Sequence, residues 1–438
     1  MRIGLIHAFT AMILALSTTL PATAQSFMID DILYESTDGK NVEITAEFPY
    51  STSGDVTLPS SVTYGGKTYT VTSIGDRAFQ NNKNITSIVI PESITKIGSF
   101  VFAGCGNMVS AKIPNSVTTL GASVFSQCYK LEKVELGTGI NSISMNMFVD
   151  CTSMATIDIP DNISSISPGA FARSGLTSFV FPDKITKIDE FTFTGCTNLK
   201  SVKIGNGVTI IGEAFSESGL TSIDIPEGVT IIYNSFNNCT DLKYVSLPES
   251  LKEIGFNTFY GCTALETIEI PDAVTLLEYN VFTDCANLKT VVLGKNISSI
   301  GNETFLGCNK LENVYCKSQT PPTVENTEML FPENIKNATL YVPQNTKNSY
   351  SSTAPWSYFG TIIEQDFEVG IIDVTTESNV SIMADGGTIT VSGANAARVE
   401  VYTTDGQCVY SGTETTITNL PRGIYIVKAA GQSKKVTL

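Results

Sequence analysis

The chain has 438 residues, of which 42% are hydrophobic and only 16% are charged, so it is long enough to bury a large core. Its formal net charge of −16 argues against nucleic acid or an anionic membrane as a partner, because no basic patch can outweigh that field. The only histidine, His7, lies in an N-terminal apolar run, which excludes Ser-His-Asp, Cys-His and His-based zinc chemistry from the rest of the chain.

The first 24 residues, MRIGLIHAFTAMILALSTTLPATA, have the parts of a secretory signal peptide. Arg2 gives a short positive region, residues 3–20 are mostly apolar, and the segment ends in the small-residue motif A-T-A. A transmembrane anchor is the alternative, but Pro21 breaks a helix and no stop-transfer charges follow. We therefore expect residues 1–24 to be removed, and the mature protein to be exported to the cell surface or the medium with no transmembrane span.

Residues 25–71 differ in pattern from the regular repeat that follows, although they merge into it at Val71. A stack of repeats exposes an apolar layer at its end and needs a polar cap there. We therefore expect residues 25–71 to form the N-terminal cap.

Phenylalanine recurs along the middle of the chain at intervals of 21 to 23 residues. Self-similarity at this period is typical of a solenoid, in which each coil buries its apolar face only against its neighbours. The eleven repeating positions are Phe79, Phe102, Phe125, Phe148, Phe171, Phe193, Phe215, Phe236, Phe259, Phe282 and Phe305.

Each unit contains two short extended pieces. In LETIEIP, Ile268 and Ile270 alternate with Glu269, which predicts a strand with the isoleucines inside; Pro271 then ends the strand because proline has no N–H to donate. A second piece, such as SITKIG at residues 93–98, precedes the turn that leads back to phenylalanine. The predicted fold class is mainly β: a solenoid of about eleven 21–23-residue coils with short parallel strands.

A cysteine follows the repeating phenylalanine by three residues in most units. A metal array would need converging ligands, whereas a stack spreads its thiols along a line. Disulfides between neighbouring coils are an alternative in an exported protein, but parallel Cβ vectors suit the disulfide dihedral poorly. We favour a ladder of small buried side chains, since Asn82, Ser174 and Ser218 replace cysteine elsewhere with similar size and hydrogen-bonding capacity. The ladder cysteines are Cys105, Cys128, Cys151, Cys196, Cys239, Cys262, Cys285 and Cys308, while Cys316 occupies an inward strand position.

The segments LTSIDIPEGVTIIYNSFNNC and LETIEIPDAVTLLEYNVFTDC show the repeat in full. The pattern resembles the BspA-like class of bacterial leucine-rich repeats over residues 72–317. That resemblance implies a right-handed, curved leucine-rich-repeat solenoid, displayed on a bacterial surface or secreted and used for contacts with host or microbial macromolecules. It implies no catalytic activity.

Residues 318–368 break the repeat and contain clustered proline and asparagine together with the only tryptophan, Trp356. Similar closing segments, with T-P-P, L-Y-V-P and W-x-x-F, occur in relatives of the BspA-like class, which implies a C-terminal cap segment. A ligand platform around Trp356 and Tyr358 is one interpretation. We favour a buried aromatic plug under the cap.

Residues 369–438 alternate strand-like runs with the turn residues Asp405-Gly406 and Pro421-Arg422-Gly423, which predicts a small antiparallel β-sandwich. The stretches YTTDGQCVY, LPRGIYIVK and KKVTL resemble the C-terminal sorting domain of the type IX secretion pathway. That resemblance implies an address for crossing the outer membrane, either cleaved or retained. A small immunoglobulin-like spacer is the alternative.

The outward position between the two inward strand residues forms one row across the coils, which we call the outward row. An acidic pair in neighbouring coils, such as Glu135 and Asp158, is what a polysaccharide hydrolase or lyase would need, but such residues also suit a solvated binding face. The candidate binding residues of the outward row are Lys112, Glu135, Asp158, Lys203, Asp224, Glu269 and Tyr315. A second candidate, an apolar patch on the other extended piece, comprises Ile210, Ile231 and Leu276, which are alternatively isolated surface residues.

The sequence therefore favours an exported, non-enzymatic repeat protein that binds a macromolecule, either protein or glycan, over a broad polar β-face. We expect no catalytic residues, no metal ligands, no cofactor and a monomer. The alternative is a solenoid hydrolase or lyase acting on polysaccharide. The sequence does not identify the ligand.

Overall fold

The computed structural model describes residues 25–36, 38–47, 51–367, 381–385, 388–392, 399–403, 408–418, 420, 424–429 and 432–437. The predicted signal peptide, residues 1–24, lies outside these described residues. The chain divides into two compact units, Met1–Gln365 and Asp366–Leu438, and each is described here by itself.

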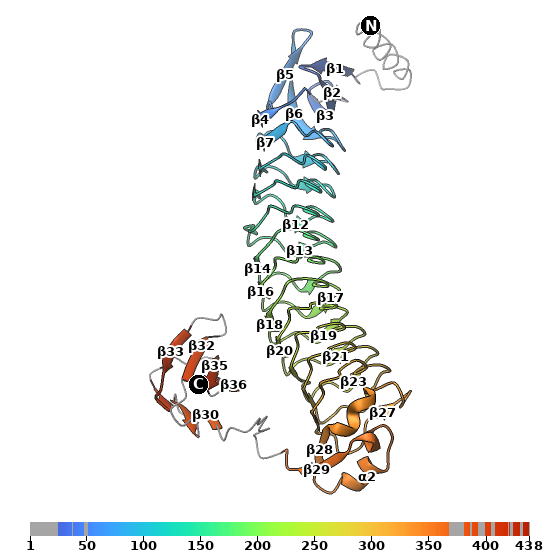
Figure 1. Cartoon of the computed structure of the whole chain (residues 1–438). Coiled ribbons are helices and arrows are strands. Elements are labelled where there is room, and N and C mark those ends of the chain that lie inside the picture. Colours follow the sequence, from blue (N-terminus) through green and yellow to red (C-terminus); the bar gives the residue numbers. More distant parts are fainter. Residues whose placement is uncertain are drawn as a thin grey trace. The chain divides into compact units, whose positions relative to one another are not determined.

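The first unit begins with a cap in which most strand pairs are antiparallel and one, between residues 41–47 and 67–74, is parallel (Figure 1). Its aromatic centre is Phe27, which stacks on Tyr34 and Tyr64 with ring centroids 5.8 and 4.5 Å apart. The cap strands are β1 (Gln25–Ile29), β2 (Ile32–Ser36), β3 (Asn41–Glu47), β4 (Gly54–Thr57), β5 (Ser61–Tyr64) and β6 (Lys67–Ile74). Strands β4 and β6 pair in parallel with the first strands of the two ladders that follow, so the cap continues directly into the coils.

The strand predicted from LETIEIP and its equivalents forms the first ladder. Its pairs are parallel, and equivalent residues of successive coils face each other, as Ile268 faces Val291 and Val291 faces Val314. The ladder is not one continuous sheet: residues 155–160 form no strand, and strand pairing also breaks between the strands of residues 201–203 and 222–224 and between those of residues 244–246 and 267–269. The strands are β7 (Ile85–Val89), β9 (Ser110–Lys112), β11 (Lys133–Glu135), β14 (Ser178–Val180), β16 (Ser201–Lys203), β18 (Ser222–Asp224), β20 (Tyr244–Ser246), β22 (Thr267–Glu269), β24 (Thr290–Leu293) and β26 (Asn313–Cys316).

The second extended piece of each unit forms the second ladder, which Figure 1 shows on the other side of the coils. Seven of its strands, from β15 to β27, make one continuous parallel sheet. The strands are β8 (Lys96–Ile97), β10 (Thr119–Leu120), β12 (Ser142–Ile143), β13 (Ser165–Ile166), β15 (Lys187–Ile188), β17 (Ile210–Gly212), β19 (Ile231–Tyr233), β21 (Glu253–Ile254), β23 (Leu276–Leu277), β25 (Ser299–Ile300) and β27 (Thr323–Val324). The prediction of a mainly β solenoid is confirmed.

The repeating phenylalanines form one continuous stack through the interior. From Phe79 to Phe305 every ring is fully buried, and neighbouring ring centroids lie 5.4–5.8 Å apart with nearly parallel planes. The shorter coils keep this spacing, at 5.5 Å between Phe193 and Phe215 and again between Phe215 and Phe236. Residues are therefore lost from the turns without disturbing the stack.

The turns around each phenylalanine need two left-handed residues, two positions before it and two positions after it. In the coil of Phe259 these are Asn257, with φ 52°, and Gly261, with φ 68°. A Cβ on Gly261 would lie 2.3 Å from Oδ1 of Asn238, the equivalent residue of the preceding coil. Neighbouring turns therefore interlock, with an asparagine side chain filling the space left by a glycine.

We expect Gly261→Ala to destabilise its coil by about 1–2 kcal/mol, because alanine is strained at positive φ and its methyl group meets Asn238. Urea unfolding measures the change. Gly106→Ala is the matched control, since a Cβ there would have its nearest contact at 3.4 Å. Equal midpoints for the two variants would contradict the interlocking of neighbouring turns.

The first unit ends in a cap built from η2 (Glu333–Asn337), β28 (Thr339–Pro343), α2 (Lys347–Ser351), η3 (Trp356–Tyr358) and β29 (Thr361–Gln365). Strands β28 and β29 add to the first ladder after β26. Trp356 is fully buried, its Nε1 donates to the carbonyl of Pro322 at 2.9 Å, and its ring meets Phe331 and Tyr350 edge-on. The prediction of a buried aromatic plug is confirmed for Trp356.

The second unit contains two antiparallel sheets, in agreement with the predicted sandwich. One has β30 (Ser381–Asp385), β31 (Thr388–Ser392) and β34 (Thr416–Ile417), and the other has β32 (Val399–Thr403), β33 (Cys408–Gly412), β35 (Ile424–Ala429) and β36 (Gln432–Thr437). Inward residues of both sheets share one core: Ile389, Val391, Val399, Val401, Ile417, Tyr425, Val427 and Val436.

Candidate functional site

The cysteine ladder is part of the interior. Each of its eight thiols is buried and donates a hydrogen bond to the backbone carbonyl of the phenylalanine one coil earlier, as Cys262 does to Phe236 at 3.2 Å. Burial raises the pKa of the Cys239 thiol to about 11 and that of the Cys308 thiol to about 12, so neither is a nucleophile near neutral pH. The prediction of a ladder of free, buried thiols is confirmed.

The residues that replace cysteine also make hydrogen bonds to neighbouring parts of the stack, but with other partners. Asn82 donates to the carbonyl of Thr52 at 2.9 Å, while the hydroxyls of Ser174 and Ser218 lie 3.5 and 3.3 Å from the Sγ atoms of the next coils. Cys316 is also buried, with its Sγ 3.2 Å from the hydroxyl of Tyr350. The thiols thus connect one coil to the next rather than form a reactive centre.

The outward row is brought together by the parallel register of the first ladder. Lys112 lies beside Glu135, Lys203 beside Val180, and Glu269 beside Val292. The charged residues of the row are all exposed: Lys112, Glu135, Asp158, Lys203, Asp224 and Glu269. The row therefore presents charges of both signs to solvent, two lysines and four acidic residues.

Glu135 is held by two lysines. Its carboxylate lies 2.9 Å from Nζ of Lys133 and 3.4 Å from Nζ of Lys112. The hydrogen bond from Lys133, followed by its charge, holds the pKa of Glu135 below its usual range. A general acid needs a raised pKa, so this environment does not suit Glu135 for proton donation. Its proposed partner Asp158 lies where the ladder is interrupted.

Tyr315 requires a correction, because the structure does not expose it as the sequence pattern predicted. Only 5% of its surface is accessible, and its ring stacks on Tyr341 with centroids 4.3 Å apart. Val292, its neighbour in the row, is equally buried. Lys317 reaches from the end of β26 to Glu269 on β22, with an Nζ–Oε1 distance of 3.0 Å, and must cross β24 near Val292 to do so.

The three predicted patch residues do not lie together. Ile210 and Ile231 face each other on neighbouring strands and are half-buried. The next residue in register is Glu253, which is exposed and separates Ile231 from Leu276. The second ladder therefore offers an isoleucine pair and a separate leucine at these positions.

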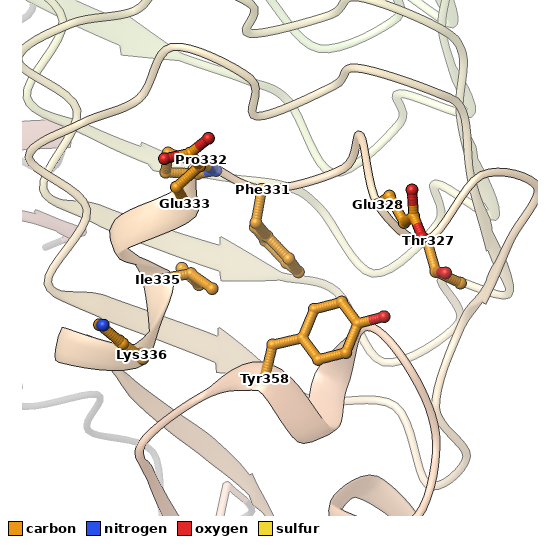
Figure 2. A pocket seen from close by; sticks show the side chains of 8 residues that line it. All are labelled: Thr327, Glu328, Phe331, Pro332, Glu333, Ile335, Lys336 and Tyr358. Carbon is orange, nitrogen blue, oxygen red and sulfur yellow. The ribbon is translucent and has the colours of Figure 1, made fainter.

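The C-terminal cap contains a hollow (Figure 2). Of the residues that line it, the sequence analysis named only Tyr358. We call this space the C-cap hollow. Its volume is about 340 Å³, and it is lined by Thr327, Glu328, Phe331, Pro332, Glu333, Ile335, Lys336 and Tyr358. These residues come from three separate segments that contain no repeat, so only the exposed tyrosine beside a buried tryptophan signals the site.

Within the described part of the chain, no group of three or more His, Cys, Asp or Glu side chains converges in a way that could hold a metal ion. Among the same residues, no helix has the length and apolarity that crossing a membrane requires.

Stacked coils with two parallel ladders and an inner column of aromatic rings define a leucine-rich-repeat solenoid. The family model that matches the chain is the BspA type leucine rich repeat region, found over residues 60–177, 128–235, 164–255 and 230–352. The chain belongs to this family, since the matches span more than half of its length. A search of curated proteins gives no significant match.

Solved structures with similar folds come from several bacteria. A leucine-rich repeat protein from Bacteroides ovatus is 24% identical, with 66% of this chain and 94% of that chain covered and a TM-score of 0.41. A leucine rich cell surface protein from Faecalibacterium prausnitzii is 23% identical, with 78% and 95% covered and a TM-score of 0.46. The pneumococcal vaccine antigen PcpA is 19% identical, with 78% and 99% covered and a TM-score of 0.46.

Proposed function

We propose that this protein is an exported, non-enzymatic binding protein of the bacterial surface, which contacts a protein or glycan through the outward row. The observation that carries the proposal is the exposure of six charged residues at equivalent positions of the repeat, one per coil, of which Lys112 and Glu135 are paired in register. The ladder cysteines and the repeating phenylalanines are buried, so they are not accessible to a partner, whereas the outward row is. Affinity would come from many modest polar contacts spread over several coils.

The alternative function is cleavage of a polysaccharide by Glu135 and Asp158, as a hydrolase or a lyase. Two lysines hold Glu135 ionised, which favours a binding role over a general acid. We therefore expect no release of product from any polysaccharide that the protein retains.

Charge reversal on the outward row should test the binding role. Lys112→Glu combined with Lys203→Glu removes two exposed cations from the row, whereas Lys252→Glu combined with Lys347→Glu makes the same charge change elsewhere. Biolayer interferometry against purified extracellular-matrix proteins and bacterial cell-wall glycans is the measurement. We expect the first pair to weaken binding by about tenfold or more and to reduce its salt dependence, while the control pair binds as the wild type does.

Two outcomes would contradict the proposal. Equal binding by both double variants would remove the outward row as the contact surface. Soluble oligosaccharides released from a retained glycan would favour the enzyme instead.

We further propose that the second unit is a secretion signal, as its resemblance to the type IX sorting domain implies. An antiparallel sandwich that folds around its own core supports this role, because an address must be read independently of its cargo. Mass spectrometry of protein recovered from culture medium tests it. Secreted protein that appears unchanged after deletion of residues 369–438 would contradict it.

A further inference from the structure

The C-cap hollow combines an apolar floor with a polar rim. Phe331, Pro332 and Ile335 form the floor and are buried, with Phe331 and Ile335 only 6% and 5% exposed. Figure 2 shows Tyr358 beside Phe331, with Thr327 and Glu328 on one side of the hollow and Ile335 and Lys336 on the other. A half-open apolar space of this kind, bordered by a few polar groups, is the usual form of a small-molecule site.

We propose that the C-cap hollow binds one neutral pyranose unit of a glycan. Tyr358 would provide the platform: 42% of its surface is exposed, although Trp356 and Phe359 on either side of it are 0% and 5% exposed. A sugar ring has an apolar C–H face that can lie on an aromatic ring while its hydroxyl groups point outward. Covering Tyr358 in this way removes apolar surface from water.

The rim provides groups that suit hydroxyls. Within the described part of the chain, the side-chain oxygens of Thr327, Glu328 and Glu333 accept no hydrogen bond from another protein group. Carboxylates elsewhere on the solenoid cap backbone N–H groups of the next coil, as Asp272 does for Lys295 at 3.0 Å. The rim carboxylates are therefore not needed for the fold and remain available as acceptors.

The charge of the rim favours a neutral ligand. Glu328 and Glu333 repel anionic sugars, as does the net charge of −16, while Lys336 on the wall repels a cationic side chain. A sugar hydroxyl both donates and accepts, so it can pair with a carboxylate, a hydroxyl or an ammonium group. The C-cap hollow lies outside the outward row, so a sugar there neither requires nor excludes a partner on that row.

Saturation-transfer NMR on the intact chain tests the site, with methyl β-D-glucopyranoside, methyl β-D-galactopyranoside and methyl α-D-mannopyranoside as probes. We expect at least one of them to bind with a dissociation constant on the order of 1 mM. Tyr358→Ala should weaken that binding by about tenfold, while Tyr358→Phe should retain it because the ring remains. Tyr279→Ala is the matched control, since that tyrosine is 50% exposed and lies outside the hollow.

Glu333→Lys provides a second variant that does not depend on the aromatic ring, and we expect it to weaken binding as well. Absence of saturation transfer to all three sugars would overturn the proposal, as would equal binding by the Tyr358→Ala and Tyr279→Ala variants. Binding of lysine methyl ester in preference to the sugars would also overturn it, because the hollow would then recognise cations. Thermal melting of each variant checks that the cap is intact.

Discussion

Replacing Phe259 by alanine is expected to lower the free energy of unfolding of its region by about 3–5 kcal/mol. The ring is fully buried and stacks between Phe236 and Phe282 at centroid distances of 5.5 and 5.4 Å. The stack cannot close the resulting cavity, because the two ladders fix the spacing of the coils. Coils interact only with their neighbours, so the loss should be largest in the coils of these three phenylalanines.

Glu269→Ala is the control for Phe259→Ala, since both residues belong to the same coil. The Glu269 side chain is 65% exposed and its only ion pair, to Lys317, is on the surface, so its loss should cost no more than about 1 kcal/mol. Thermal unfolding compares the variants, and amide hydrogen exchange shows which coils lose protection. Similar melting of the two variants would mean that the register of the solenoid is wrong.

Raising the pH is expected to unfold the solenoid between about pH 9 and 11 through its buried thiols. The pKa of the thiol is about 11 for Cys239 and Cys316 and about 12 for Cys308, against an ordinary value of 9.0. Because the pKa is raised in the folded state, the neutral thiols stabilise that state fully below pH 9. Their contribution is lost as the pH rises from 9 through 11 to 12.

The expected loss is large because the thiols act together. For each pH unit above the pKa of the unfolded state, each buried thiol lowers the free energy of unfolding by between about 1 and 2 kcal/mol. The total free energy of unfolding of a domain is only about 5–15 kcal/mol. Circular dichroism between pH 7 and pH 11 measures the transition. A variant with serine at positions 239, 262 and 285 should unfold at higher pH, since serine does not titrate. Native circular dichroism of the wild type at pH 11, or a triple-serine variant with an unchanged midpoint, would contradict this account.

The fold could be predicted because each coil repeats the same sequence pattern. Alternation in segments such as LETIEIP, a proline that ends the strand and a phenylalanine at a fixed interval specify two ladders and one inner stack. Cysteine three residues later was interpretable as filler because Ser174 and Ser218 replace it. Eleven consistent copies remove the ambiguity that a single short strand would have.

The candidate sites were harder to predict, because they depend on contacts that break the repeat. Tyr315 has an outward position by register, yet Tyr341 of the non-repeating cap stacks on it. The C-cap hollow joins residues such as Thr327 and Tyr358, whose proximity follows only from how the cap folds back. Sequence periodicity predicts which way a side chain points, whereas its accessibility also depends on segments outside the period.

The aromatic stack has a consequence for how this protein can change over generations. It runs without a break from Phe79 through Phe305 and continues to Phe331 in the cap. Duplication or deletion of one whole unit would leave every ring inside the stack with a partner above and below it. The solenoid can therefore become longer or shorter by one coil at a time through duplication or deletion of a repeat, while the N-terminal and C-terminal caps remain unchanged.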